Sequence, residues 1–192
     1  MRKLLPVLAL LAMMVTPAAA RPVTLLALGD SLTAGYGLQP SDAFPVKLEA
    51  ALRAKGHDVK VINAGVSGDT ALDGASRLDW ALAEPVDAVI VELGANDALR
   101  GLPVPQAEAA LDQLLATLAE KNIPALLAGM RAPPNLGPDY QKAFDGMYPR
   151  LAEKHGVPLY PFFLDGVAAD TGLNQADGMH PNPAGVDVIV QR

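Results

Sequence analysis

Hydrophobic and polar positions along the chain fall into two kinds of block. Short apolar runs recur at 23–28, 59–62, 86–93, 125–128 and 157–160. Each run is too short for a typical helix and is bounded by Gly, Pro, Asn or Asp, which is typical of a buried strand. The pattern therefore predicts five strands.

Longer segments with helical spacing lie between these runs. The clearest is an apolar stripe that follows Pro105 and consists of Ala107, Leu111, Leu114, Leu115 and Leu118. The other predicted helices cover 45–55, 70–82 and 139–155. Because neighbouring parallel strands need long crossover connections, this alternation predicts an α/β fold: one three-layer α/β/α domain around a five-stranded parallel sheet.

The first 20 residues have the layout of a secretory signal. Arg2 and Lys3 precede an apolar run over 4–15, and small residues follow up to Ala20. The run is shorter than the roughly 20 residues that a membrane span needs, which disfavours a retained anchor. We expect cleavage after Ala20, a mature domain over 21–192, and a periplasmic or secreted protein without a stable membrane anchor.

Composition narrows the classes of function. The chain is 51% hydrophobic and 19% charged, which excludes a disordered protein. The formal charge is −6, or −6 − 2 = −8 without Arg2 and Lys3, so no nucleic-acid partner is expected. The chain has no Cys, which excludes disulfides and a thiolate nucleophile. It has only 3 His, so a metal centre with several histidine ligands would need nearly all of them.

The fold class indicates where to look for function. Ligands of open parallel α/β sheets bind beyond the carboxyl ends of the strands. The loops that leave those ends here are 29–37, 63–69, 94–101, 129–138 and 162–183, and they hold almost every polar residue capable of chemistry.

Ser31 is the candidate nucleophile. It follows Gly29 and Asp30 directly after the first predicted strand, where a tight turn places it at a helix start that favours negative charge. The alternative is a simple helix cap. Ser41 and Ser76 lie in a turn and a helix, and Ser67 is in a candidate loop but without such a turn.

Asp177 and His180 form an Asp-x-x-His unit in a loop rich in Gly and Pro. Two intervening residues let the carboxylate reach the imidazole, as a base and its orienting group require. A metal site at this pair would need further ligands. His57 and His155 end helices on the opposite side of the sheet, so they are expected to cap helices or face solvent.

Two further loops offer hydrogen-bond donors. Asn96 supplies a side-chain amide, and Gly68, without a side chain, lets a backbone N–H approach a bound oxygen. Each is also an ordinary turn residue when taken singly. Their arrangement with Ser31 on three loops favours an oxyanion hole.

Together these residues resemble the four blocks of the SGNH, or GDSL, hydrolase family. The blocks are Gly29-Asp30-Ser31-Leu32, Gly68, Gly94-x-Asn96-Asp97 and Asp177-x-x-His180. The flanking segments are similar to a bacterial periplasmic group of thioesterases, lysophospholipases and arylesterases. The resemblance extends over essentially all of the mature chain.

The resemblance implies a role for each of these residues. Ser31 would be the nucleophile, His180 the base and Asp177 its orienting group, while the Ser31 N–H, the Gly68 N–H and the Asn96 side chain would form the oxyanion hole. It also implies no cofactor and a flavodoxin-like strand order of 2-1-3-4-5. The family's last helix runs further than the segment 188–192, so we expect a shortened final helix.

Apolar residues in two of the loops predict an acyl groove. They are Leu99, Leu102, Met130, Pro133 and Leu136, with Gly101 as a hinge, although each could equally pack within its loop. We expect a monomer that hydrolyses carboxylic and aryl esters, acyl thioesters and lysophospholipids. The alternatives are a carbohydrate acetylesterase, disfavoured by the single Trp, and a non-catalytic flavodoxin-like binding module.

Overall fold

The computed structural model describes residues 21–192, so the predicted signal segment and its cleavage point lie outside the described residues. Within that range, no helix combines the length and the apolar character that a membrane span requires.

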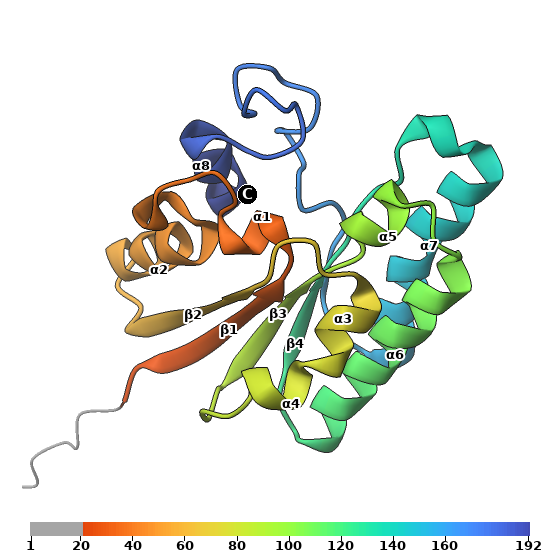
Figure 1. Cartoon of the computed structure of the whole chain (residues 1–192). Coiled ribbons are helices and arrows are strands. Elements are labelled where there is room, and N and C mark those ends of the chain that lie inside the picture. The colour runs from red at the N-terminus through yellow and green to blue at the C-terminus, as the bar shows by residue number, and fades with distance from the viewer. Residues whose placement is uncertain (1–20) are drawn as a thin grey trace, which may run out of the picture.

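A parallel five-stranded sheet forms the centre of the molecule (Figure 1). Its order is β2-β1-β3-β4-β5, which confirms the predicted order 2-1-3-4-5 and the α/β class. The register aligns Gly29 of β1 with Gly65 of β2 and Glu92 of β3, so three strands end side by side. The strands are β1 (Val23–Gly29), β2 (Val59–Gly65), β3 (Ala88–Glu92), β4 (Ala125–Ala128) and β5 (Leu159–Tyr160).

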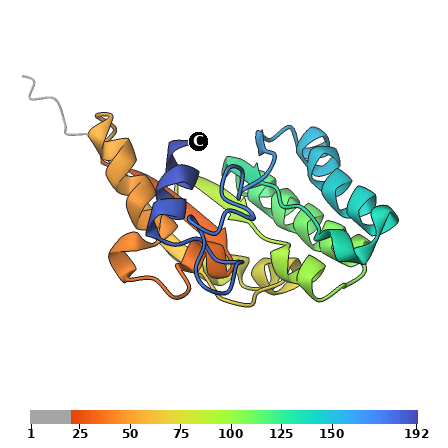
Figure 2. The same cartoon turned by 90° about the horizontal axis from the view of Figure 1, so that it is seen from above.

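Helices cover both faces of this sheet (Figures 1 and 2). On one face, α2 (Phe44–Ala54) packs against α8 (Pro183–Gln191). On the other face, α6 (Val104–Glu120) lies between α3 (Ala71–Ser76) and α7 (Pro138–His155). The arrangement is the predicted three-layer architecture.

The core lies between the sheet and these helices. Leu26 and Leu28 of β1 are fully buried, as strands covered on both faces require. The apolar stripe of α6 is also buried and includes every residue predicted for it. Burial of this stripe against the sheet fixes the ends of the strands, from which the polar loops emerge.

The predicted helix over 70–82 is divided into two. α3 ends and α4 (Leu78–Ala81) begins at Arg77, whose backbone φ of −101° and ψ of 6° are not helical. The Arg77 guanidinium binds the Asp69 carboxylate and the Gly29 carbonyl. This contact with a distant strand end is a tertiary constraint that helical periodicity does not record.

Two predicted strands are shorter than expected. β3 covers Ala88–Glu92 rather than 86–93, and β5 covers only Leu159–Tyr160 rather than 157–160. Pro158 has no N–H to donate to a ladder, and it contributes only its carbonyl, which accepts from Leu127 N. Two predicted loops also contain short α-helices, α1 (Ser31–Ala34) and α5 (Ala95–Leu99).

Candidate active site

Ser31 is the first residue of α1, one residue after the N-cap Asp30. The turn before it is tight, because a Cβ on Gly29 would lie 2.1 Å from Thr33 Oγ1. The Asp30 carboxylate accepts a hydrogen bond from Leu32 N at 3.0 Å and so caps the helix, which means that the alternative prediction of Ser31 as the cap is wrong. The Ser31 hydroxyl is therefore available to other partners.

His180 contacts the Ser31 hydroxyl across 149 positions of sequence. Its Nε2 lies 2.9 Å from Ser31 Oγ, and its Nδ1 lies 2.7 Å from Asp177 Oδ2. The other oxygen, Asp177 Oδ1, accepts from the backbone N–H groups of His180 at 3.0 Å and Met179 at 2.9 Å. These backbone donors, together with the imidazole, lower the pKa of Asp177 to about 2. The carboxylate is thus ionised at every pH at which the protein would work.

A hydrogen bond and a ring contact connect the loop that carries His180 to the loop that carries Ser31. Gln175 Nε2 donates to Tyr36 O at 2.7 Å and to Pro181 O at 3.0 Å, and Gln175 N donates to His180 O at 2.7 Å. The Tyr36 ring also packs against the imidazole, tilted by 38° with a centroid distance of 4.7 Å. Sequence reasoning assigned no role to Gln175 or Tyr36, since such cross-loop contacts leave no local pattern.

The predicted hydrogen-bond donors lie around Ser31. Ser31, Gly68 and Asn96 all line one cavity, and Gly68 adopts a φ of +90° that favours glycine. In the part of the chain that the structure describes, no hydrogen bond engages the backbone N–H of Ser31 or of Gly68. Asn96 Nδ2 donates to Asp30 Oδ2 at 3.1 Å and to Asp69 O at 3.0 Å, so both of its hydrogens are held by neighbouring loops.

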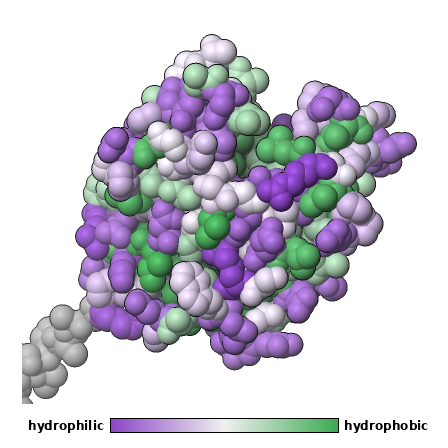
Figure 3. Space-filling model, viewed as in Figure 1, coloured by the Kyte–Doolittle hydropathy of each residue, from purple (hydrophilic) through white to green (hydrophobic). Residues whose placement is uncertain are grey.

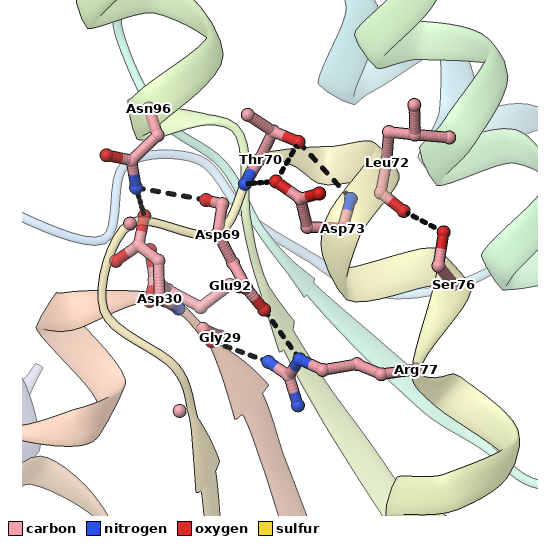
Figure 4. A network of polar contacts seen from close by, with 12 residues as sticks. Gly29, Asp30, Asp69, Thr70, Leu72, Asp73, Ser76, Arg77, Glu92 and Asn96 are labelled. Atoms are coloured by element: carbon pink, nitrogen blue, oxygen red, sulfur yellow. Dashed lines mark hydrogen bonds and ion pairs between the residues drawn. The ribbon is translucent and has the colours of Figure 1, made fainter.

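A polar network holds these three loops together (Figure 4). Arg77 Nε pairs with Asp69 Oδ2 at 2.5 Å, and Arg77 Nη2 donates to Gly29 O at 2.9 Å. Asn96 connects the same loop to Asp30. The end of β1, the loop after β2 and the start of α5 are therefore fixed relative to one another.

The cavity beside Ser31 and His180 has a volume of about 450 Å³. Figure 3 shows a hollow at the upper edge of the molecule, with hydrophobic residues along it. Its lining is mostly apolar and comes from all five loops that leave the carboxyl ends of the strands. Besides Ser31, His180, Gly68 and Asn96, the lining includes Tyr36, Leu99, Met130, Arg131, Pro133, Phe162, Leu164, Ala168, Ala169 and Met179.

The predicted groove residues divide into two groups. Leu99, Met130 and Pro133 line the cavity, whereas Leu102 and Leu136 do not. Leu136 instead lies near Gly101, and the Leu102 carbonyl accepts from Tyr140 Oη at 2.8 Å. The wall formed by Phe162, Leu164, Ala168 and Ala169 was not predicted, because the segment between β5 and α8 has no periodicity to indicate which side chains face inward.

The remaining candidate residues lie elsewhere or have structural contacts. His155 Nε2 contacts Asp112 Oδ1 at 2.7 Å on the helical layer, and His57 is exposed. Ser76 Oγ donates to Leu72 O within α3, whereas Ser67 lines the cavity. Between residues 21 and 192, no group of three or more His, Asp and Glu residues is placed to hold a metal ion.

Comparison with known proteins agrees with this geometry. Residues 27–188 match the model of the GDSL-like lipase/acylhydrolase family. The chain is 44% identical over 163 residues to Esterase TesA of Pseudomonas aeruginosa, covering 82% of this chain and 79% of that protein. It is 43% identical over 165 residues to Thioesterase 1/protease 1/lysophospholipase L1 of Escherichia coli K12, covering 85% and 78%.

A solved structure extends this similarity to three dimensions. The crystal structure of AlinE4, described as an SGNH-hydrolase family esterase, superposes with a TM-score of 0.81 at 48% identity and covers 91% of this chain and 94% of that one. The resemblance found in the four sequence blocks is thereby confirmed. The chain belongs to the GDSL-like lipase/acylhydrolase family and is a hydrolase of ester bonds.

Proposed function

We propose that this hydrolase forms an acyl-enzyme on Ser31. The observation that carries the proposal is the 2.9 Å contact between His180 Nε2 and Ser31 Oγ. His180 takes the hydroxyl proton as Ser31 Oγ attacks the acyl carbonyl, and it then gives that proton to the leaving alkoxide or thiolate. In the second half, His180 deprotonates a water that attacks the acyl-enzyme, and the proton returns to Ser31 Oγ as the acid leaves.

Asp177 has a supporting role in this mechanism. Its carboxylate, 2.7 Å from His180 Nδ1, fixes the tautomer that leaves Nε2 free to accept the Ser31 proton. It also stabilises the imidazolium that forms at each proton transfer. The low pKa of Asp177 keeps the negative charge in place throughout the cycle.

Three donors would stabilise the oxyanion. The N–H groups of Ser31 and Gly68 have no other hydrogen-bond partner within residues 21–192, and the side chain of Asn96 lines the same cavity. One such donor is worth about 3–4 kcal/mol of activation free energy. To donate to the oxyanion, the Asn96 amide must release or share one of its two present acceptors, Asp30 Oδ2 and Asp69 O. The charge on Asp30 therefore affects how readily the Asn96 amide donates to the substrate.

The cavity supports a broad range of acyl substrates. Its mostly apolar lining and volume of about 450 Å³ suit short to medium acyl chains, and Ser31 and His180 line the same cavity. We propose carboxylic and aryl esters, acyl thioesters and lysophospholipids as substrates. The names of the two relatives, an esterase and a thioesterase/lysophospholipase, support this range.

The test combines variants with a substrate panel. Ser31→Ala and His180→Ala should each lower kcat by about 10⁵- to 10⁶-fold, the scale known for serine-hydrolase triads. His57→Ala and His155→Ala are the matched controls and should retain turnover. Equal losses in all three histidine variants would show that His180 is not the base.

The substrate panel uses p-nitrophenyl and thioester substrates of increasing acyl length. Activity should extend over short and medium chains. A strict preference for acetylated sugars would contradict the proposed range and favour a carbohydrate acetylesterase instead.

We further propose that the mature enzyme begins at Arg21, works in the periplasm or after secretion, and is a monomer. The signal-like pattern over 1–20 supports this location. Mass spectrometry of the protein recovered outside the cytoplasm should give a chain that starts at Arg21. A chain recovered only in the cytoplasm with residues 1–20 attached would contradict the proposal.

A further inference from the structure

A second carboxyl group lies beneath the nucleophile and has no part in the mechanism above. Glu92 is the last residue of β3 and is fully buried, at 0% exposure. Its Oε2 accepts from Thr33 Oγ1 at 2.8 Å and from Asp30 N at 3.4 Å. Its Oε1 is buried and has no hydrogen-bond partner among residues 21–192. A side chain of this kind is rare unless it is paired or uncharged.

Glu92 supports the turn that presents Ser31. A Cβ added to Gly29 would lie 2.7 Å from Glu92 Oε2, so the carboxyl group packs directly against the backbone of the turn. Through Thr33 it also holds α1, and through Asp30 N it holds the residue before Ser31. Any movement of the Glu92 carboxyl group is therefore transmitted to the position of Ser31.

Asp30 is the second fully buried carboxyl group, also at 0% exposure. Both of its oxygens accept hydrogen bonds, from Leu32 N at 3.0 Å and from Asn96 Nδ2 at 3.1 Å. These donors favour the ionised form of Asp30, whereas burial opposes it and raises the pKa to about 6. At neutral pH the negative charge therefore lies on Asp30.

Two adjacent buried carboxyl groups without a cation cannot both be charged. The Arg77 guanidinium, which is part of the same network, pairs with Asp69 rather than with either of them (Figure 4). Burial, followed by the charge on Asp30, raises the pKa of Glu92 well above its ordinary value. Between the two, Glu92 is the one that keeps its proton.

Other titratable or charged groups surround the pair, and most would oppose a second negative charge. Tyr148 on α7 is fully buried, and this burial raises the pKa of its hydroxyl. Positive charge comes from the Arg77 guanidinium, which donates to Gly29 O, next to Asp30 in the chain. Asp69 and Arg77 lie around α3 and His180 lies before α8, while Asp97 on α5 and Asp145 on α7 lie near Tyr148.

We propose that Glu92 is a positioning residue that acts in its neutral form: it supports the turn before Ser31 and leaves the single buried negative charge on Asp30, which holds Asn96. The inference rests on the proposed function of Ser31 and Asn96. Ionisation of Glu92 as the pH rises would place a second charge beside Asp30 and displace the turn, so kcat would fall while substrate binding changed little.

The test compares Glu92→Gln with Glu92→Leu from neutral to alkaline pH. Gln keeps the shape and a carbonyl acceptor but cannot ionise, so kcat at neutral pH should stay within about threefold of the wild type and its alkaline decline should disappear. The Glu92→Leu variant loses the oxygen that accepts from the Thr33 hydroxyl and from the Asp30 backbone N–H. Its kcat should therefore fall about 10²-fold at every pH while KM stays nearly constant. Loss of activity in Gln equal to that in Leu would overturn the proposal, as would identical alkaline midpoints in Gln and wild type.

A second pair of variants tests the same contact if Glu92→Leu does not fold. Thr33→Val keeps the shape of the side chain but removes the hydroxyl that donates to Glu92, whereas Thr33→Ser keeps it. We expect Thr33→Val to lower kcat about tenfold and Thr33→Ser to lower it less. Equal kcat in the two variants would contradict a positioning role for this contact.

Infrared spectroscopy provides a readout without substrate. At neutral pH the wild type should show a protonated-carboxyl carbonyl band that Glu92→Gln lacks. The same spectrum in both proteins would overturn the neutral form of Glu92. Because this band does not depend on turnover, it separates failure of this inference from failure of the proposed function, which Ser31→Ala tests alone.

Discussion

Two carboxyl groups flank Ser31, and their surroundings are opposite. Asp177 is one-third exposed, accepts two backbone N–H groups and the His180 ring, and has its pKa lowered to about 2. Glu92 is fully buried, leaves one oxygen without a partner in residues 21–192, and has its pKa raised. The burial of Glu92 and the donors around Asp177, rather than the carboxyl chemistry that the two share, decide which one is charged.

The difference matches the chemistry on each side of the nucleophile. On the outer side, an imidazolium forms at each proton transfer, and a fixed negative charge at Asp177 stabilises it. On the inner side, where Asp30 and Glu92 are both buried, only one negative charge is stable, and Asp30 has the hydrogen-bond donors that stabilise it. A charged outer carboxylate and a neutral inner one thus serve the same serine.

Asp177→Asn should have the largest effect on this comparison. It keeps the size of the side chain but removes the charge and favours the wrong imidazole tautomer, so kcat should fall about 10⁴-fold. Asp139→Asn, an exposed acid in the first turn of α7, is the matched control. Steady-state kinetics on a p-nitrophenyl ester would measure both, and a loss of less than tenfold in Asp177→Asn would contradict a role for the outer charge.

Asn96→Ala should have the next largest effect, because Asn96 binds the buried Asp30 carboxylate and is the proposed side-chain donor to the oxyanion. Loss of one oxyanion donor should lower kcat about 10²- to 10³-fold with little change in KM. Asn135→Ala, an exposed amide beyond the cavity, should leave both constants unchanged. If KM rises while kcat is retained, Asn96 binds the ground state rather than the oxyanion.

The smallest expected effect concerns stability. A raised pKa for Glu92 means that the folded state holds a proton that the unfolded state releases above about pH 4.5. The free energy of unfolding contributed by this group is therefore present in full below that pH and is lost as pH rises toward the folded-state pKa, by up to about 1.4 kcal/mol per pH unit. Glu92→Gln lacks this loss.

Urea denaturation at a series of pH values measures this effect. The free energy of unfolding of the wild type should decline relative to that of Glu92→Gln as pH rises from mildly acidic to neutral. A difference between the two proteins that stays constant with pH would mean that Glu92 titrates alike in the folded and unfolded states.

The fold could be predicted from the sequence because its signals are local and repeated. The five apolar runs lie where the strands lie, and β4 has the predicted bounds. The stripe on α6 faces the core because a period of 3.6 residues places its members on one side. The break at Arg77 could not be predicted, because it depends on contacts with Asp69 and with the end of β1.

The site could be predicted only in its chemistry. Residue type and position in loops at the ends of strands are enough to identify Ser31, Asp177 and His180 as candidates. The structure brings the three side chains together. Glu92 lies inside the apolar run over 86–93, whose pattern predicts only a strand. A single acid at the carboxyl end of a buried strand is a signal, but its charge depends on Asp30 and Thr33, which only the fold places beside it.

Mapping the site of covalent labelling tests the central claim most directly. A fluorophosphonate reacts with a serine only where a base and an oxyanion hole activate it, and Ser67 in the same cavity is the internal competitor. The account predicts one label per chain, on Ser31, with simultaneous loss of ester hydrolysis and no labelling of Ser31→Ala. A label on Ser67, or hydrolysis that continues with Ser31 fully labelled, would contradict it.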